Sequence, residues 1–322
     1  MDAIFYPIKL IADWLTYSVF LITPKTLLAE AVNFFIYDTI KIFALLLVII
    51  FTVSTIRSFL PPEKIRRIVS KQNKYVGHVL AALLGIVTPF CSCSAIPLFL
   101  GFIEAGIPLG VTFSFLVSSP MVNEVAVVLL FGLFGWKIAF LYVVSGVTIA
   151  VVSGIVIGWL KVEYLLESSV LGLGIKDTNV DPTQSWRERF VYAKDYTFDI
   201  IKRVWLFIII GVGLGAWIHG YVPTDLLAQC AGVGSWYAVP IAVLIGIPLY
   251  SNAAGIIPLV AVLTEKGVAM GTVLAFMMAV TALSLPEFFI LKKVMKIRLI
   301  LIFAGIVGAG IIFTGYLFNI LL

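Results

Sequence analysis

The sequence has little charge: only 12% of its 322 residues are Asp, Glu, Lys or Arg, whereas soluble domains have about 25%. Hydrophobic residues make up 61% of the chain, and the mean hydropathy is +1.12. So few charges cannot cover the surface of a soluble particle, which excludes a water-soluble enzyme. At about 20 residues for each helical crossing, the length allows roughly eight to ten membrane-spanning segments.

Other residue types and motifs are also scarce. Three cysteines do not make a disulfide framework, and two isolated histidines make no metal site. No Gly-x-x-x-x-Gly-Lys-Ser/Thr motif occurs, so gradient-driven transport is favoured over an ATP-driven pump, and no cofactor is expected. The net charge of +5 could suggest a nucleic-acid partner, but basic residues of a membrane protein mark its cytoplasmic loops. We therefore expect contact with membrane lipid and none with nucleic acid.

Apolar segments long enough to span a membrane recur along the chain. Residues 4–23 are interrupted by Lys9 and Asp13, which suits an amphipathic or short spanning helix. Two further segments, 76–103 and 237–263, are broken midway by polar and helix-disrupting residues. The sequence therefore predicts an all-α polytopic membrane protein. The other long apolar segments are 31–56, 107–134, 138–160, 199–217, 267–291 and 299–321.

The two halves of the chain match each other at a constant offset of 161 residues. A chance match of charged residues, prolines and glycines at one offset is improbable, so we interpret the halves as an internal duplication. Beyond Phe115 we expect the alignment to shift by five residues, which sets Pro120 against Pro286. We take Thr281, Ser284, Pro286 and Glu287 as the counterpart of the segment 118–124. The matching pairs include Asp38/Asp199, Lys41/Lys202, Pro62/Pro223, Glu104/Glu265 and Gly110/Gly271.

The basic residues predict how the halves lie in the membrane. Residues 57–74 carry six Lys and Arg side chains, and the equivalent residues 218–235 carry none, so the first segment should be cytoplasmic and the second outside. When the basic segments 161–203 and 292–298 are placed in the cytoplasm, each broken segment must enter and leave the membrane by the same face. Each broken segment is then a re-entrant hairpin. Three transmembrane helices plus one hairpin in each half give an inverted-topology repeat, the plan of many secondary transporters. The predicted parts are an N-terminal amphipathic or spanning helix (1–30), repeat 1 (31–160), a cytoplasmic linker (161–198) and the inverted repeat 2 (199–322).

The tip of the first hairpin carries two thiols one residue apart. Pro89 disfavours helix before it, so the chain should open there. The tip then offers Cys91, Ser92, Cys93 and Ser94 at the start of a returning helix, whose N-terminus favours anions. Two soft sulfur donors could also hold a thiophilic centre such as trivalent arsenic. The alternative is that both cysteines are small packing residues.

The tip of the second hairpin contains no sulfur. Tyr250, Ser251 and Asn252 supply oxygen and amide groups there instead. A substrate held between the two tips would meet sulfur on one side and oxygen or amide on the other. Alternatively, these polar groups only satisfy the backbone that the turn frees.

Two carboxylates are expected at membrane depth. Glu124 follows a helix-breaking Ser-Ser-Pro sequence, with Ser119 and Asn123 nearby, and Glu287 follows a second proline. An ionisable group in the membrane costs about 2.5–3.5 kcal/mol on insertion scales and usually marks a substrate or proton path. We therefore expect Glu124 and Glu287 to couple protons, and Ser119 and Asn123 to contact substrate. Fixed polar packing is the alternative.

Two segments of the chain resemble a known family. The stretches TPFCSCSAIPLFLGFIEAGIPLG and FLVSSPMVNE are similar to the signature of the predicted-permease family that includes the ArsP-type organoarsenical efflux permeases and the YraQ-like proteins. The resemblance covers most of the chain, and it implies a permease of the cell inner membrane whose characterised relatives export trivalent organoarsenicals with the proton gradient. It places Cys91 and Cys93 in the family's cysteine motif, and Ser119, Pro120, Asn123 and Glu124 in its second motif.

The predicted function is a secondary transporter that exports a small thiophilic or anionic solute in exchange for protons. Cys91 and Cys93 are candidate ligands for a soft metalloid, and no resident metal is expected. Two alternatives stay open: a channel whose filter is formed by the hairpin tips, or a membrane thiol oxidoreductase using Cys91 and Cys93, for which no second thiol pair is present. The substrate, the direction of transport, the coupling ion and the oligomeric state also stay open.

Overall fold

The computed structural model describes most of the chain, and what it describes is almost entirely helical. No β-strand occurs among the described residues, where an isolated bridge pairs Leu166 with Met295. The prediction of an all-α protein is therefore confirmed for this part of the chain. The described residues are 2–23, 26–59, 74–87, 92–104, 106–167, 186–221, 236–249, 256, 259–260, 263–264, 267–292 and 294–322.

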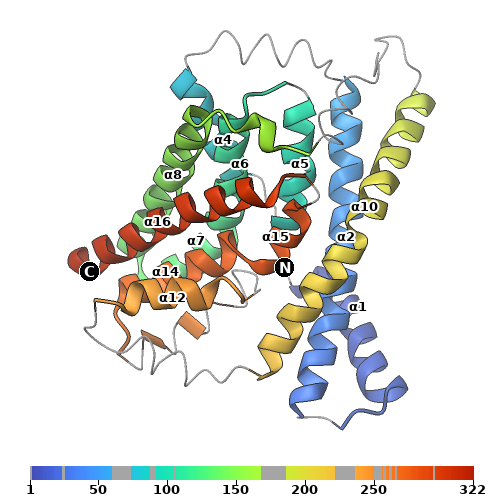
Figure 1. Cartoon of the computed structure of the whole chain (residues 1–322). Helices are drawn as coiled ribbons and strands as arrows, with labels where there is room; N and C mark the ends of the chain where they lie inside the picture. Colours follow the sequence, from blue (N-terminus) through green and yellow to red (C-terminus); the bar gives the residue numbers. More distant parts are fainter. Residues whose placement is uncertain are drawn as a thin grey trace.

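Long helices occupy most of the expected apolar segments (Figure 1). The segments 31–56 and 199–217 lie within α2 and α10, and 138–160 and 299–321 correspond to α8 and α16. The elements are α1 (Asp2–Asp13), the π-helical turn η1 (Trp14–Val19), α2 (Leu27–Phe59), α4 (Lys74–Val87), α5 (Ser92–Glu104), α6 (Leu109–Met121), α7 (Glu124–Phe134), α8 (Trp136–Trp159), the 3-10 turn η2 (Glu163–Leu165), α10 (Trp186–Tyr221), α12 (Ala238–Gly246), α14 (Met270–Ala282), α15 (Leu285–Leu291) and α16 (Ile297–Leu321).

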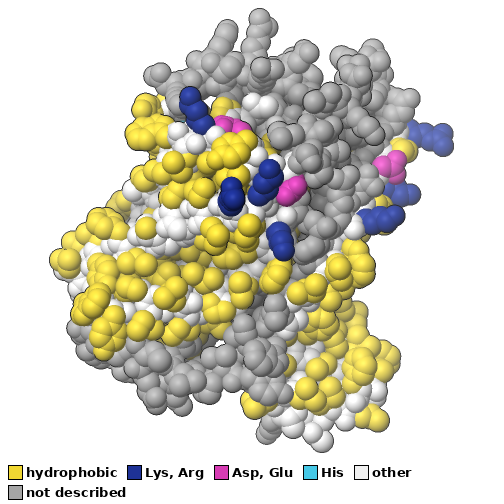
Figure 2. All heavy atoms as spheres, viewed as in Figure 1, with side chains coloured by type: hydrophobic (Ala, Val, Ile, Leu, Met, Phe, Trp, Pro, Cys, Tyr) yellow, Lys and Arg dark blue, Asp and Glu magenta, His cyan; other side chains and the backbone are white. Residues whose placement is uncertain are grey.

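Several described helices could cross a membrane. Trp136–Trp159, Met270–Leu291 and Ile297–Leu321 are long and apolar enough, and α6 with α7 forms a fourth candidate span that is bent by 47°. Figure 2 shows hydrophobic side chains over much of the described surface, including that of α16. Leu301 and Phe313 of α16 are 64% and 70% exposed, as lipid-facing residues are. This arrangement fits a multi-pass membrane protein.

The two longest helices, α2 and α10, pack against each other and run in opposite directions (Figure 1). The rings of Phe51, late in α2, and Phe190, early in α10, meet edge to face with centroids 4.8 Å apart. Phe35, near the start of α2, contacts Gly213 near the end of α10. The first turns of α10, from Trp186, fall within the segment 161–198 that was expected to be a linker loop.

The N-terminal segment forms a helical hairpin with α2. The helix α1 and the turn η1 occupy the expected segment 4–23 and pack on α2. Asp13, one of the two charges that interrupt this segment, accepts a hydrogen bond of 2.8 Å from the amide of Asn33 in α2. The charge thus stabilises the packing of the two helices.

The remaining helices form two similar groups. In the first group α4, α6 and α8 pack together, and in the second α12, α14 and α16 do the same. The helix bounds match at the offset of 161 residues: α6 begins at Leu109 and α14 at Met270, while α8 begins at Trp136 and α16 at Ile297. The groups contact each other through α6 with α14 and through α8 with α16, so equivalent helices meet.

The expected shift of five residues between the halves is wrong. The helices keep the offset of 161 beyond Phe115, because the breaks after α6 and α14 lie at equivalent positions. Pro120 is therefore equivalent to Thr281 and not to Pro286, since the difference between 281 and 120 is 161. By the same difference Glu124 is equivalent to Leu285. The shift followed from matching two prolines that play different roles in their helices.

Glycines at equivalent positions allow the close approach of helices in each group. A Cβ atom on Gly110 of α6 would collide with the backbone oxygen of Gly154 in α8, and a Cβ on Gly271 of α14 would collide with that of Gly315 in α16. Small residues at such crossings bring backbones into contact, which stabilises helix packing in membranes. Both groups of helices therefore have the same kind of close contact between glycines.

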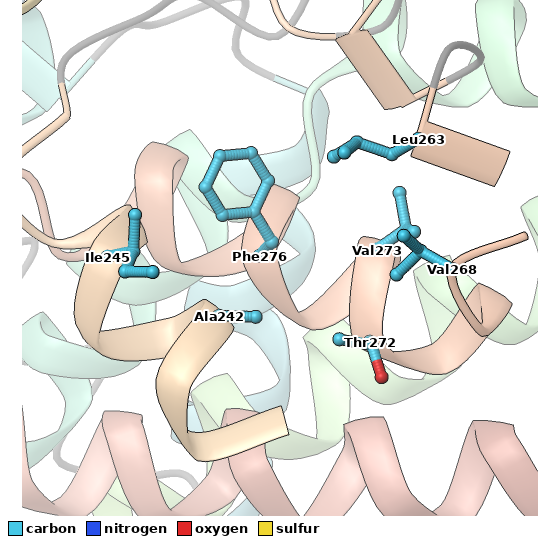
Figure 3. Close-up of a pocket in the computed structure, with 7 residues that line it drawn as sticks. All are labelled: Ala242, Ile245, Leu263, Val268, Thr272, Val273 and Phe276. Atoms are coloured by element: carbon cyan, nitrogen blue, oxygen red, sulfur yellow. The ribbon is translucent and has the colours of Figure 1, made fainter. Parts of the chain in front are cut away.

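One packing difference separates the groups. The rings of Phe102 and Phe115 meet edge to face with centroids 5.1 Å apart. The residues at the offset of 161 are Leu263 and Phe276, which line a small cavity of about 10 Å³ between α12 and α14 (Figure 3). The shorter Leu263 leaves unfilled the space that Phe102 occupies. With room for about one water molecule and an apolar lining apart from Thr272, this cavity is no candidate for a solute site.

Gly271→Ala should lower the free energy of unfolding by roughly 1–3 kcal/mol, because the new methyl group meets backbone that cannot rotate away. The midpoint of thermal unfolding of the purified protein in detergent measures this loss. Gly305 of α16 has nothing within 4 Å of an added Cβ, so Gly305→Ala should keep or raise the midpoint. Equal midpoints for the two variants would contradict the close contact of α14 with α16.

Candidate functional site

Two helix breaks define the candidate site. The first lies between α6 and α7 at Val122 and Asn123, and the second lies between α14 and α15 at Leu283 and Ser284. They are equivalent at the offset of 161 residues. The predicted interruption of the segment 107–134 is therefore confirmed, and the segment 267–291 is interrupted at the matching place.

Proline acts differently at the two breaks. Pro120 lies inside the last turn of α6, where it removes one backbone donor, and the helix ends one residue later. Pro286 lies in the first turn of α15, where proline is tolerated because the N–H groups have no helical partner. Proline also disfavours helix at the residue before it, so the chain opens ahead of α15.

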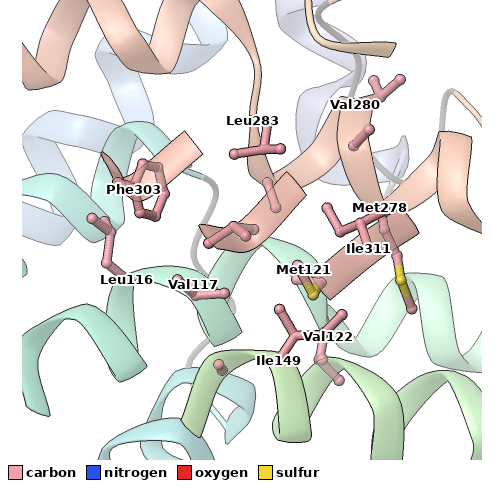
Figure 4. Packing of buried hydrophobic residues seen from close by; sticks show 14 of the residues in the cluster. Leu116, Val117, Met121, Val122, Ile149, Met278, Val280, Leu283, Phe303 and Ile311 are labelled. Atoms are coloured by element: carbon pink, nitrogen blue, oxygen red, sulfur yellow. The ribbon is translucent and has the colours of Figure 1, made fainter. Parts of the chain in front are cut away.

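Both breaks lie in the packed core between the two groups of helices. Met121, Val122 and Leu283 are fully buried, and Figure 4 shows them among apolar residues from both halves, including Ile149 and Ile311. Irregular backbone is tolerated at membrane depth only where protein or a wet cavity surrounds it. The core supplies that shelter here.

The backbone groups next to the breaks find partners in other helices. The buried hydroxyl of Tyr142 in α8 donates a hydrogen bond of 2.6 Å to the carbonyl of Met121, the last residue of α6. The side chain of Thr281 in α14 lies beside the same hydroxyl, so Tyr142 joins the two halves. At the second break, the N–H of Leu285 donates a 3.0 Å hydrogen bond to the carbonyl of Ile247, just after α12.

The two expected carboxylates each begin a short helix. Glu124 is the first residue of α7 and is half-buried, whereas Glu287 lies in the first turn of α15 and is 1% exposed. Unpaired N–H groups at a helix N-terminus favour negative charge, so both carboxylates stand where backbone stabilises them. The two are not equivalent, because Glu287 corresponds to Ala126.

The other described candidates lie close to the first break. Ser119 is buried in α6, and Asn123 is half-buried between α6 and α7, where its carbonyl accepts a 3.0 Å hydrogen bond from the N–H of Val127. Ser119, Asn123 and Glu124 therefore cluster around one break. The structure does not place Glu287 in this cluster; it belongs to the second break.

The hairpin tips are described only in part. Cys91, Tyr250, Ser251 and Asn252 lie outside the described residues. The backbone of Ser92, Cys93 and Ser94 forms the first turn of α5, so a helix begins at the cysteine motif as expected. The helix α5 packs against α2, α6 and α15. The helix that begins with the cysteine motif thus contacts the helix of the other half that carries Glu287 (Figure 1).

Three buried polar residues were missed by the sequence reasoning. His78 in α4 is 3% exposed, and its Nδ1 atom lies 2.9 Å from the hydroxyl of Ser114 in α6. Tyr142 bonds the first break, as described above. Ser284 opens α15, and its buried hydroxyl forms no hydrogen bond with a described residue.

A comparison of the halves would have pointed to two of these residues. The positions equivalent to His78 and Ser114 are Val239 and Ala275, and the position equivalent to Tyr142 is Phe303. A polar side chain in one repeat opposite an apolar one in the other is a signal of a specific role. Among the described residues no group of three His, Cys, Asp or Glu could hold a metal ion.

Tyr142→Phe should lower the free energy of unfolding by roughly 1–3 kcal/mol, because it leaves the buried carbonyl of Met121 without its partner. Thermal unfolding in detergent measures the change. Tyr164→Phe is the matched control, since Tyr164 is 69% exposed and its loss of a hydroxyl should leave the midpoint unchanged. A Tyr142→Phe protein as stable as the control would rule out a structural role for this bond.

Comparison with known proteins agrees with this architecture. Residues 27–320 match the ArsP_1 family, described as a predicted permease. A UPF0718 protein of Methanocaldococcus jannaschii is 25% identical over 313 residues, covering 79% of this chain and 84% of the relative. A Streptococcus mutans protein, provisionally named a two-component membrane permease complex subunit, is 26% identical over 255 residues, covering 78% and 82%. The UPF0718 protein YraQ of Escherichia coli is 22% identical over 273 residues, covering 81% and 73%.

No solved structure matches the chain. The family match spans nearly the whole length, and it includes both helix breaks and the helix that follows the cysteine motif. Broken, buried helices with carboxylates at their N-termini suit a protein that passes solutes through a membrane. The chain is a multi-pass membrane transporter that belongs to the ArsP_1 family of predicted permeases.

Proposed function

We propose that the protein is a proton-coupled secondary transporter of the cell inner membrane that exports a small thiophilic or anionic solute, such as a trivalent organoarsenical. The observation that carries this proposal is the contact of α5 with α15. The first of these helices begins with Ser92-Cys93-Ser94, and the second carries the buried Glu287. The motif that we propose for solute binding and the carboxylate that we propose for proton binding are thus on contacting helices of opposite halves.

The orientation of equivalent helices supports an inverted repeat. Residues 188–220 of α10 are equivalent to α2 at the offset of 161, and the two helices run antiparallel in contact with each other. A two-fold axis in the membrane plane reverses each helix of a repeat, so equivalent helices that meet on such an axis are antiparallel. Transporters built in this way bind solute near the midplane, between half-helices, and expose it to each side in turn. The basic linker 161–198 then lies in the cytoplasm.

Two parts of the protein could move against each other during transport. Apart from α1 and η1, the pair of α2 and α10 contacts the other helices chiefly through α5 and α15 (Figure 1). A shift of this pair would change the surroundings of both the cysteine motif and Glu287 in one step. Binding of the solute and binding of the proton are then coupled, because both change the same contacts, those of α2 and α10 with α5 and α15.

The chemistry of the proposed contacts suits a soft centre. Thiolates of Cys91 and Cys93 bind trivalent arsenic more strongly than oxygen ligands do. Ser92, Ser94, Ser119 and Asn123 add hydrogen bonds to the solute's polar groups. From the second hairpin, Tyr250, Ser251 and Asn252 contribute hydroxyl and amide groups on the opposite side. The buried hydroxyl of Ser284 is a further proposed donor, because it forms no hydrogen bond with a described residue and buried polar groups normally have a partner.

Cys91→Ser and Cys93→Ser should each reduce saturable flux of methylarsenite into or out of proteoliposomes by about tenfold or more, because oxygen replaces the soft donor. Cys230→Ser, which removes the third cysteine, is the control and should retain flux. Arsenite and nitrate, tested in the same vesicles, define the substrate class. Full methylarsenite flux in both variants would overturn the thiol contact. Loss of flux together with thiol oxidation coupled to turnover would instead favour an oxidoreductase.

Glu287→Gln should abolish the acceleration of flux by an imposed pH gradient, because the amide cannot exchange a proton, while solute exchange without a gradient persists. Glu124→Gln tests the second carboxylate in the same way. The control is Glu163→Gln, since Glu163 is exposed in the turn η2 after α8. Flux that neither saturates nor responds to the gradient in the unmodified protein would favour a channel. A gradient response that survives in both variants would exclude these carboxylates as the proton carriers.

A further inference from the structure

An open groove of about 590 Å³ lies where the chain leaves α15 and enters α16. One wall is formed by the turn between these helices and the other by the segment 164–167 that follows α8. Three cations line it, Lys292, Lys296 and Arg298, together with the single carboxylate of Glu167. Among the described residues that line the groove, the side chains therefore give a net charge of +2.

Backbone pairing holds the walls of the groove together. The N–H of Lys296 donates a 2.8 Å hydrogen bond to the carbonyl of Leu165, and the N–H of Glu167 donates a 3.0 Å bond to the carbonyl of Val294. These bonds form the antiparallel bridge between Leu166 and Met295, and both of these side chains are buried. These hydrogen bonds and the buried bridge residues hold in place the backbone that carries the cations.

The three cations are available to a ligand. The side chains of Lys292, Lys296 and Arg298 are all exposed. The Nζ atom of Lys296 donates a weak 3.4 Å hydrogen bond to the carbonyl of Tyr164. Figure 2 shows Lys and Arg side chains gathered over the turn between α15 and α16, next to the hydrophobic surface of α16.

The fold itself does not require this cluster. The positions equivalent to Lys292 and Lys296 in the first half are Phe131 and Gly135, so the matching turn between α7 and α8 is built without them. Only Arg298 has a basic equivalent, Lys137. Two of the three cations therefore have no basic equivalent in the first half, and the repeated fold does not need them.

The surroundings of the groove fit a position at the level of lipid headgroups, in the membrane orientation proposed above. Lys296 precedes α16, a helix that could span the membrane, and the first residues of that helix include the exposed Ile297 and Leu301. Trp159 and Tyr164 are also exposed nearby in the sequence, and such aromatic residues favour the membrane interface. A basic turn at the interface on the cytoplasmic side faces a leaflet rich in anionic lipid.

We propose that this groove binds the phosphate headgroup of an anionic phospholipid, with the acyl chains lying along the exposed apolar face of α16. The charge of the groove matches a phosphodiester, and the apolar residues beside it match the chains. A soluble phosphate would use the cations alone and leave the apolar face uncovered. Basic pockets of this kind at the cytoplasmic ends of transmembrane helices suit headgroups such as those of cardiolipin or phosphatidylglycerol.

The test compares lipids in thermal unfolding of the full chain in detergent. Added cardiolipin or phosphatidylglycerol should raise the unfolding midpoint of the unmodified protein by several degrees, and phosphatidylcholine should raise it much less. In Lys292→Gln/Arg298→Gln, which keeps the Lys296 backbone and side-chain bonds, at least half of the anionic-lipid shift should be lost. Native mass spectrometry should show the number of retained anionic lipids fall in the same variant.

Lys137→Gln is the matched control, because Lys137 is the repeat equivalent of Arg298 and lies in the other half. It should keep the full lipid shift. Glycerol phosphate, added at the same concentration, should have no comparable effect. An unchanged shift in the double variant, an equal shift with phosphatidylcholine, or an equal effect of glycerol phosphate would each overturn the proposal. If the double variant unfolds at a lower midpoint without lipid, the single variant Lys292→Gln gives the same comparison on an intact fold.

Discussion

The structure depends on one constraint: at membrane depth, irregular backbone must find its hydrogen-bond partners inside the protein. Two helices are broken in the core, and each break finds a hydrogen-bond partner on another element of its own half. The hydroxyl of Tyr142 donates a hydrogen bond to the carbonyl of Met121 at the end of α6. The N–H of Leu285, at the start of α15, donates one to the carbonyl of Ile247. The contacts of α6 with α14 and of α8 with α16 hold these partners in place. The carboxylates proposed to bind protons lie in the first turns of α7 and α15.

The two groups of helices share one arrangement, and we propose that the differences between the halves carry the function. Close glycine contacts occur at the same positions in both groups of helices, because backbone packing tolerates little change. Polar groups differ more: His78 and Ser114 are paired in the first half, where Val239 and Ala275 stand in the second. The cysteine motif belongs to one half and the buried Glu287 to the other. A transporter that must bind different species on its two sides requires such asymmetry.

Much of the fold could be predicted from the sequence, for identifiable reasons. Long apolar segments predicted α8 and α16 within a few residues, because the length of a spanning helix is set by bilayer thickness. The break near Pro120 followed from the chemistry of proline. The alignment beyond Phe115 was wrong because Pro120 and Pro286 look alike in sequence, whereas one ends a helix and the other begins one. Only the helix bounds distinguish these roles.

The sequence by itself determined that the chain is helical, membrane-spanning and duplicated. Composition, segment length and residue spacing are local properties, so they can be read directly along the sequence. It could not determine which distant groups meet. Every residue of α6 is buried, so this helix has no polar face from which a partner could be inferred. Tertiary packing alone decided that Tyr142 closes the first break, that Glu124 and Glu287 are not equivalent, and that α5 contacts α15. The physical reason is that buried hydrogen bonds and close contacts are selected by the fit of whole helices, which no local pattern records.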